Sequence, residues 1–434
     1  MADLSGFPYF EVQFTKDGEV HDPAEAQEVV DFAGSSGVTD LFVMSHGWNN
    51  DMADARSLYA AFFARLRQEV DAARVAGAAG RKFGVLGILW PSKKFAEKEL
   101  IPSGAAGLGD LISAADLQAE IDRFGDDLGA EKLARAKALV PKLEDSPAAR
   151  DELVTLLRSL LPPSIEGEEA PRQLLALPGR DVLAKLSKPV FSTAPAGGPG
   201  KAAGLGAASP AGGAAGFGLL SGIKGGLFKL LNLTTYYQMK ERAGTVGRQG
   251  VSSLLRQLRA RRPDLKLHLI GHSFGARVVT AAALGPDGQP PVKPTTLTLL
   301  QGAFSHYGFA QGYETGKDGF FRRVVSEARI GGPVVITCTH NDDAVGKAYP
   351  IASQLAGQVA EALGDKDSLY GGLGANGAQK TPEAQDGTLL PAGGAYQLAA
   401  GKLFNLNADA VIKNHSDIVK NEVAHVLLTS VAAT

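Results

Sequence analysis

The stretch LKLHLIGHSFGARVV, residues 265–279, places Ser273 between two glycines directly after an apolar run. The chain has 53 glycines among 434 residues, so the bare pattern G-x-S-x-G carries little information by itself. Here, however, a predicted buried strand precedes the pattern and a predicted helix follows it, and that context is specific. The stretch therefore predicts a sharp strand-to-helix turn that presents the serine side chain.

The two glycines suit a backbone that passes close to its neighbours. Gly271 and Gly275 lack the Cβ atoms that would collide with the adjacent strand and helix. We expect Ser273 to lie at the carboxyl edge of a sheet, where the N-terminus of the next helix favours developing negative charge. A free serine hydroxyl is a poor nucleophile, so a base and a carboxylate that orients this base are needed.

Four histidines follow Ser273: His306, His340, His415 and His425. His425 lies inside a predicted amphipathic terminal helix, and the two earlier histidines leave little room for an intervening acid at a strand end. In folds with this type of turn, the catalytic residues follow one another along the chain in the order serine, acid, histidine. His415 lies in the loop KNHSD between the last predicted strand and the last helix, so we predict that it is the base.

The acid is expected just past a strand end, and VVITCTHNDDAVG (334–346) supplies two aspartates there. Asp342 and Asp343 both qualify by position. Adjacent residues of an extended segment point in opposite directions, so only one of them can face His415. We favour Asp342.

The oxyanion that forms during acyl transfer needs two backbone donors. One is the amide of Phe274, the residue after the nucleophile. The other is expected from the turn SHGWNN (45–50), where the amide of Trp48 or of Gly47 can point into the site. In this turn His46 is expected to brace the backbone rather than to take part in the chemistry.

Composition excludes several classes of function. A net charge of −2, from 44 basic and 46 acidic residues, does not indicate a surface that binds nucleic acid. A single cysteine, Cys338, excludes an internal disulfide, and the eight histidines lack metal-ligand spacing, so we expect no metal and no cofactor. The first residues do not resemble a secretory signal, so the cytoplasm is the expected compartment.

Apolar segments alternate with amphipathic helices over most of the chain. Predicted strands lie at 39–48, 82–90, 265–271, 295–304, 333–340 and 402–408, and predicted helices at 51–75, 235–262, 274–284 and 417–431. Strands that are apolar throughout indicate a parallel sheet covered on both faces. We therefore expect an α/β fold with a mostly parallel, doubly wound sheet.

Residues 92–230 differ in character from the rest. They contain a helical stripe of Leu117, Ile121, Phe124 and Leu128, a helix start at Ser146, and a Gly/Ala-rich linker at 195–216. Without them the chain has a core of ordinary size, since a single core stops growing at about 250–300 residues. We expect 1–91 and 231–434 to form the core and 92–230 to form a mostly helical cap over Ser273.

These features together resemble the α/β-hydrolase superfamily, in particular its bacterial lipase- and esterase-like members. The resemblance covers about 39–91 and 232–434 and lies in H-G-W (46–48), G-H-S-F-G (271–275), N-D-D (341–343) and His415. It implies an oxyanion turn, a nucleophile elbow, an acid and a base, and N-D-x-A-V resembles the family's strand-end pattern with Asp342 at the bend. The insertion departs from the family, because in many members the lid comes later.

The expected function is hydrolysis of a carboxylic ester of a small, apolar acyl substrate through an acyl-enzyme on Ser273. Two alternatives stay open: a catalytically silent module that binds a ligand or protein, and an acyltransferase that uses the same residues. The apolar segment 217–231 carries Lys224 and Lys229, which is more typical of a core helix than of a lipid-binding surface.

Overall fold

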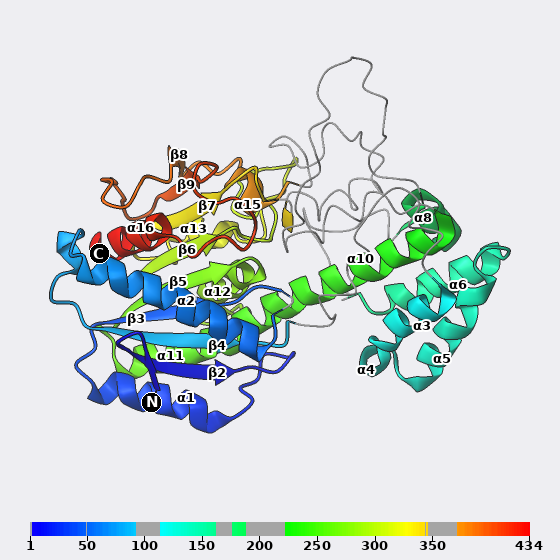
Figure 1. The fold of residues 1–434 in the computed structure, drawn as a ribbon, viewed down its shortest axis with the longest axis horizontal. Coiled ribbons are helices and arrows are strands. Elements are labelled where there is room, and N and C mark those ends of the chain that lie inside the picture. The colour runs from blue at the N-terminus through cyan, green and yellow to red at the C-terminus, as the bar shows by residue number, and fades with distance from the viewer. Residues whose placement is uncertain are drawn as a thin grey trace, which may run out of the picture.

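The computed structural model describes residues 2–48, 50–92, 113–161, 176–187, 222–342, 344–345 and 371–434. In these ranges the chain forms a nine-stranded sheet of order β1-β2-β4-β3-β5-β6-β7-β9-β8 (Figure 1). The strands are β1 Ala2–Leu4, β2 Phe7–Gln13, β3 Asp40–Ser45, β4 Phe83–Leu89, β5 Lys266–His272, β6 Thr296–Leu300, β7 Val334–Cys338, β8 Ala384–Thr388 and β9 Leu403–Asn407. Among the paired strands of this described sheet, β1–β2 is the only antiparallel pair.

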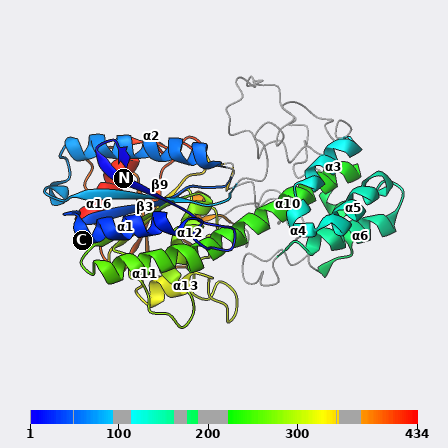
Figure 2. The ribbon, with the colours of Figure 1, turned by 90° about the horizontal axis from the view of Figure 1, so that it is seen from below.

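Helices cover both faces of this sheet. On one face lie α2 (Met52–Asp71) and α16 (Asn421–Ala432); on the other lie α1 (Pro23–Ser35), α11 (Ser252–Arg261) and α12 (Phe274–Leu284) (Figure 2). Alternate residues of β3 enter two separate hydrophobic clusters, because successive side chains of a strand point to opposite faces. The predicted α/β class with a mostly parallel sheet is confirmed.

The described part of 92–230 is largely helical. It contains α3 (Ala114–Asp122), α4 (Gly125–Leu128), α5 (Ala130–Leu139), α6 (Pro147–Arg158), α8 (Gly179–Leu186) and the first residues of α10 (Gly222–Thr245). The predicted stripe from Leu117 to Leu128 is buried, and the Ser146 hydroxyl accepts a hydrogen bond from the Ala149 amide at the start of α6. The linker at 195–216 lies outside the described residues.

One long helical rod joins the helices of the described part of 92–230, here called the lobe, to the sheet. From α10 the chain passes through a π-helical turn, Val246–Val251, directly into α11. The lobe lies beyond the edge at which the parallel strands end, and α10 packs on both α8 and α12 (Figure 1). The predicted boundary at residue 230 therefore falls inside a helix, because this helix has partners in both parts of the molecule.

Some elements differ from the sequence predictions. β6 ends at Leu300, well before residue 304, because Gln301 has a left-handed backbone with φ of 48°. β1, α1, β8, α13 (Arg322–Ser326) and α15 (Leu373–Asn376) were not predicted. Among the described residues, no helix combines the length and apolar character needed to cross a membrane.

Candidate functional site

Ser273 lies at a sharp turn on the carboxyl edge of the sheet. β5 ends at His272 and α12 begins at Phe274, so one residue connects the strand to the helix. The Ser273 backbone has φ of 58° and ψ of −124°. A non-glycine residue with positive φ is uncommon, and such strain concentrates at functional sites.

The two glycines around the serine permit this turn. A Cβ atom on Gly275 would lie 2.1 Å from the carbonyl oxygen of Ser45 in the neighbouring strand. A Cβ atom on Gly271 would lie 2.4 Å from the Cα of Ala276 at the start of the helix. Both distances are far shorter than a carbon contact, so the close approach of strand and helix requires glycine at both positions.

His46 holds the turn that follows β3. Burial lowers the pKa of His46 to about 4, so the ring is neutral near pH 7. Its Nε2 accepts a hydrogen bond from the Trp90 amide (3.3 Å), which leaves the proton on Nδ1 for the Gly47 carbonyl at 3.0 Å. The hydroxyl of Tyr59 accepts a hydrogen bond from the His46 amide at 3.0 Å. His46 thus braces the turn, as expected.

The next residues of this turn face Ser273. The Asn50 side-chain amide donates to the carbonyls of Gly47 (3.3 Å) and Trp48 (3.1 Å). Because a trans peptide directs its N–H opposite to its C=O, the held Gly47 carbonyl aims the Trp48 amide the other way. A Cβ atom on Gly47 would lie 2.6 Å from Ser273 Cβ and 3.1 Å from its Oγ. The turn and the serine are therefore in direct contact.

Phe274 supplies the other predicted oxyanion donor. It is the first residue of α12, and the first amides of a helix have no acceptor within the helix. Phe274 follows Ser273 directly, and the Gly47–Trp48 turn contacts the Ser273 side chain. Their role as oxyanion donors stays a prediction.

His415 and Asp342 come together at the same edge, with His415 Nδ1 lying 2.8 Å from Asp342 Oδ2. The buried Asp342 carboxylate also accepts hydrogen bonds from the Val345 amide (2.9 Å) and from the Gln301 side chain (3.2 Å). Burial acts to raise the pKa of Asp342, but the His415 charge and these hydrogen bonds outweigh it and hold the pKa below its usual value. Asp343 lies outside the described residues.

His272 is a site residue that sequence reasoning did not select, although it lies within the motif itself. Its Nε2 donates a hydrogen bond to the carbonyl of His415 at 2.9 Å, and the two rings have centroids 4.9 Å apart. Its Nδ1 is buried and has no hydrogen-bond partner in the part of the chain that the structure describes. Burial, followed by the nearby His415 charge, lowers the pKa of His272 to about 3. A neutral His272 therefore links the residue before Ser273 to the loop that carries His415.

Gln301 was also missed. It is fully buried at the end of β6, and its side-chain amide reaches both Asp342 Oδ2 and the carbonyl of Gly374 (3.1 Å) in α15. Its oxygen accepts a hydrogen bond from Thr337 Oγ1 at 2.9 Å. Gln301 thus orients the same carboxylate oxygen that contacts His415. No spacing pattern in the sequence indicates this role.

Aromatic side chains flank the nucleophile turn. Trp48, Phe274 and Tyr236 of α10 form a cluster with ring centroids 5.2–6.3 Å apart. The indole Nε1 of Trp48 is buried and has no hydrogen-bond partner among the described residues. The helix that leads from the lobe therefore contributes an apolar wall beside Ser273.

Among the described residues, the His415 ring has one hydrogen-bond partner, Asp342, which contacts its Nδ1. The other ring nitrogen, Nε2, has no hydrogen-bond partner there. Contacts between a nucleophile and its base are often long without substrate and tighten when substrate binds. No group of three His, Cys, Asp or Glu side chains in the described part of the chain gathers as a metal site requires. Comparison with models of known families, with curated proteins and with solved structures gave no match to this chain.

Proposed function

We propose that this chain is a serine hydrolase of the α/β-hydrolase superfamily that cleaves a carboxylic ester through an acyl-enzyme on Ser273. The observation that carries the proposal is the 2.8 Å contact of His415 with the buried Asp342, at the same sheet edge as the strained Ser273 turn. The proposed nucleophile, acid and base follow three different strands, in the chain order that is characteristic of this superfamily.

The reaction begins when Ser273 Oγ attacks the ester carbonyl and its proton passes to His415 Nε2. The Asp342 carboxylate stabilises the resulting imidazolium and keeps its ring in one orientation. The negative charge on the former carbonyl oxygen is met by the amide of Phe274 and by that of Trp48 or Gly47. The alcohol leaves with the proton from His415, and a water molecule then releases the acid by the same steps.

An apolar acyl group fits this site best. The half-buried Trp48 and the buried Phe274 and Tyr236 form an apolar cluster next to the nucleophile. We further propose that residues 92–230 act as a cap that controls which acyl groups enter. Support comes from α10, which extends from the lobe into this aromatic wall. A cap that excludes water strengthens the contacts of the oxyanion.

The test of the nucleophile is labelling with a fluorophosphonate probe. Wild type and the Ser416→Ala variant, which alters an exposed serine beside His415, should be labelled, whereas Ser273→Ala should not. Labelling of Ser273→Ala at the wild-type rate would reject the assignment. A silent binding module would show neither labelling nor turnover.

A panel of esters with increasing acyl chain length tests the substrate class. Longer apolar esters should be hydrolysed faster than acetates, and Tyr236→Ala should reduce this preference while leaving the probe reaction intact. Added alcohol acceptors distinguish an acyltransferase, which would form a new ester instead of the free acid. Removal of the lobe helices, with α10 kept, should change the chain-length preference; unchanged kinetics across the panel would reject the cap.

A further inference from the structure

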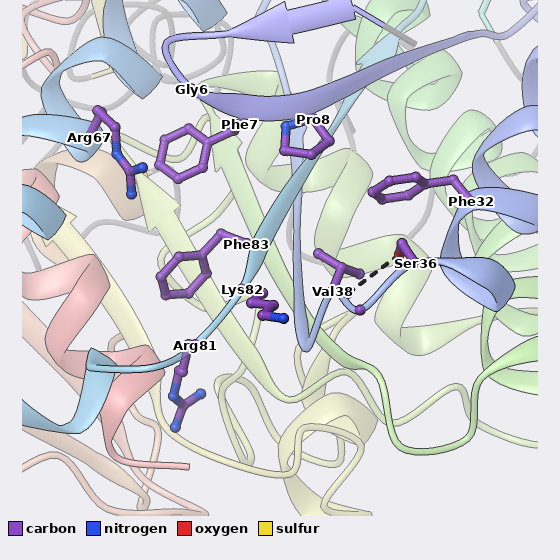
Figure 3. A pocket seen from close by; sticks show the side chains of 11 residues that line it. Gly6, Phe7, Pro8, Phe32, Ser36, Val38, Arg67, Arg81, Lys82 and Phe83 are labelled. Atoms are coloured by element: carbon purple, nitrogen blue, oxygen red, sulfur yellow. Dashed lines mark hydrogen bonds between the residues drawn. The ribbon is translucent and has the colours of Figure 1, made fainter.

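A cavity lies at the opposite edge of the sheet from Ser273. It has a volume of about 360 Å³ and lies between the β1–β2 turn, the α1–β3 loop and the start of β4 (Figure 3). β3 and β4 run from this cavity to the candidate active site. A strand rises about 3.3 Å per residue, so the length of β3 separates the two sites by roughly 20 Å.

The walls of this cavity are apolar. They include Phe7, Pro8, Phe32, Val38 and Phe83, which come from three different elements and the loops between them. In Figure 3, Phe7 and Phe83 lie on one side of the cavity and Pro8, Phe32 and Val38 on the other. Cavities of about 300–1,000 Å³ with walls of this kind are typical of small-molecule sites.

Three cations also line the cavity, and its lining of 11 residues contains no carboxylate. Arg81 has a structural role, because its guanidinium binds Asp40 at 2.8 Å and the carbonyls of Gly77 and Thr434. Its charge is therefore neutralised within the protein.

Arg67 and Lys82 are different. Arg67 lies over the Phe7 ring at 4.3 Å and forms an ion pair with the exposed Asp71, whose Oδ1 lies 3.5 Å from its Nε. Among the described residues this buried Nε makes no hydrogen bond. Lys82 is exposed, and no carboxylate of the described chain pairs with its ammonium group. In Figure 3 the Lys82 side chain lies between Phe83 and Val38. Two cations with donors to offer thus border an apolar cavity.

We infer that this cavity binds a small organic carboxylate with an aromatic or aliphatic body. The apolar walls accommodate the body, and Arg67 and Lys82 bind the carboxylate, since charge-assisted hydrogen bonds of this type are the strong ones. An inorganic anion would leave the aromatic walls unused, and an uncharged apolar compound would leave the Lys82 ammonium group without a counter-charge. The inference does not depend on the proposed esterase activity.

Calorimetric titration of the full-length chain with 2-naphthoate tests this site. We expect one saturable site, binding that is at least about 10-fold weaker for the matched alcohol 2-naphthylmethanol, and no measurable binding of acetate. Lys82→Met and Arg67→Met should each weaken naphthoate binding by about 10-fold or more, and Lys82→Glu should weaken it further. Arg65→Met, on the same helix but outside the cavity, is the control and should bind like wild type.

Ser273→Ala should bind naphthoate as tightly as wild type, which separates this cavity from the candidate active site. Loss of binding in Ser273→Ala, equal binding of the alcohol, absence of saturation, or wild-type affinity in the Lys82 variants would overturn the inference. Lys82 is exposed, so its variants report on binding even if Arg67→Met loses stability. Thermal unfolding of every variant verifies that the fold is retained.

Discussion

Each end of the sheet holds a histidine paired with a buried carboxylate. At the amino end, His268 Nε2 lies 2.9 Å from Asp40; at the carboxyl end, His415 Nδ1 lies 2.8 Å from Asp342. The two contacts are nearly equal in length, but their surroundings differ. The second nitrogen of His268 binds Thr296 Oγ1 at 2.9 Å, and the ring is fully buried. The His415 side chain is 16% exposed, and its Nε2 has no hydrogen bond in the described part of the chain.

A carboxylate contact therefore does not by itself distinguish a catalytic histidine from a structural one. His425 repeats the structural arrangement, since its two nitrogens lie 2.7 Å from Glu69 and 2.9 Å from the Gly394 carbonyl. What sets His415 apart is a nitrogen that remains available next to the nucleophile turn. Only such a ring can accept a proton during a reaction without breaking a bond that holds the fold.

Replacement of each of the two histidines by alanine tests this difference directly and has the largest expected effect. His415→Ala should lower kcat by about 10⁴-fold or more with little change in Tm, because no other group takes the Ser273 proton. His268→Ala should leave the activity of the folded protein intact but lower stability by about 1–3 kcal/mol, because the buried Asp40 loses one hydrogen-bond partner while Arg81 still compensates its charge. Ester hydrolysis and thermal unfolding of both variants provide the measurement; the opposite pattern would reject the distinction.

The next prediction concerns which of two adjacent aspartates, Asp342 or Asp343, orients His415. Asp342→Asn should lower kcat by about 10³–10⁴-fold, because an amide cannot stabilise the imidazolium and favours the wrong ring tautomer. Asp343→Asn is the matched control and should retain most of the activity. If only Asp343→Asn loses activity, the acid has been assigned to the wrong residue of the pair. Steady-state kinetics on one ester are sufficient.

Sequence patterns identified the elements whose side chains repeat with a regular period. β3, β4, β5, β7, β9 and α12 lie close to the predicted ranges, because each buries an apolar run in a two-sided sheet or against it. β8 was missed because its AQDGT sequence is polar and mostly exposed at the sheet edge. The start of α1 does carry a sequence signal, since Asp22 caps the helix and Pro23 is its first residue.

The candidate site was predictable where chain order constrains the residue and not where a tertiary contact does. Ser273, Asp342 and His415 follow strand ends in a required order. Gln301 and His272 act through hydrogen bonds to residues 41 and 143 positions away, which no local spacing encodes. Placement of Gln301 also depends on a left-handed backbone at a non-glycine residue, which the sequence does not indicate.

The oxyanion turn provides the next test. Gly47→Ala introduces a methyl group 2.6 Å from Ser273 Cβ, so the turn must move away from the nucleophile. We expect kcat to fall by about 10²–10³-fold, the loss typical of a misplaced oxyanion donor. Gly387→Ala in β8, whose new methyl group would meet only a leucine side chain at 3.2 Å, is the control. Equal activity of the two variants would show that the Gly47 turn does not contact the reacting atoms.

The smallest expected effect concerns acid stability and His272. In the unfolded chain a histidine has a pKa of about 6.5, whereas burial lowers the pKa of His272 in the folded protein to about 3. Between these values the unfolded state binds more protons, so stability falls as the pH is lowered from 7 to 5. His46, with its pKa lowered by burial to about 4, contributes in the same direction.

His272→Gln separates the two roles of this residue, because a glutamine amide can still donate to the His415 carbonyl but does not titrate. From the two pKa values, protonation of the unfolded state should cost wild type about 2 kcal/mol through His272 between pH 7 and pH 5. Urea unfolding at pH 7 and at pH 5 gives the free energy of unfolding at each pH. Its decrease between the two should be about 2 kcal/mol smaller in His272→Gln than in wild type. An equal drop in both proteins would mean that His272 is not held neutral in the folded state. At pH 8 the variant should retain activity, whereas His272→Phe, which removes the donor, should lose about 10-fold because the His415 loop is no longer held. If His272→Phe retains activity, the hydrogen bond from His272 to the His415 loop is not needed for catalysis. The available Nε2 of His415 would then be the one feature that distinguishes the His415–Asp342 pair from the His268–Asp40 pair.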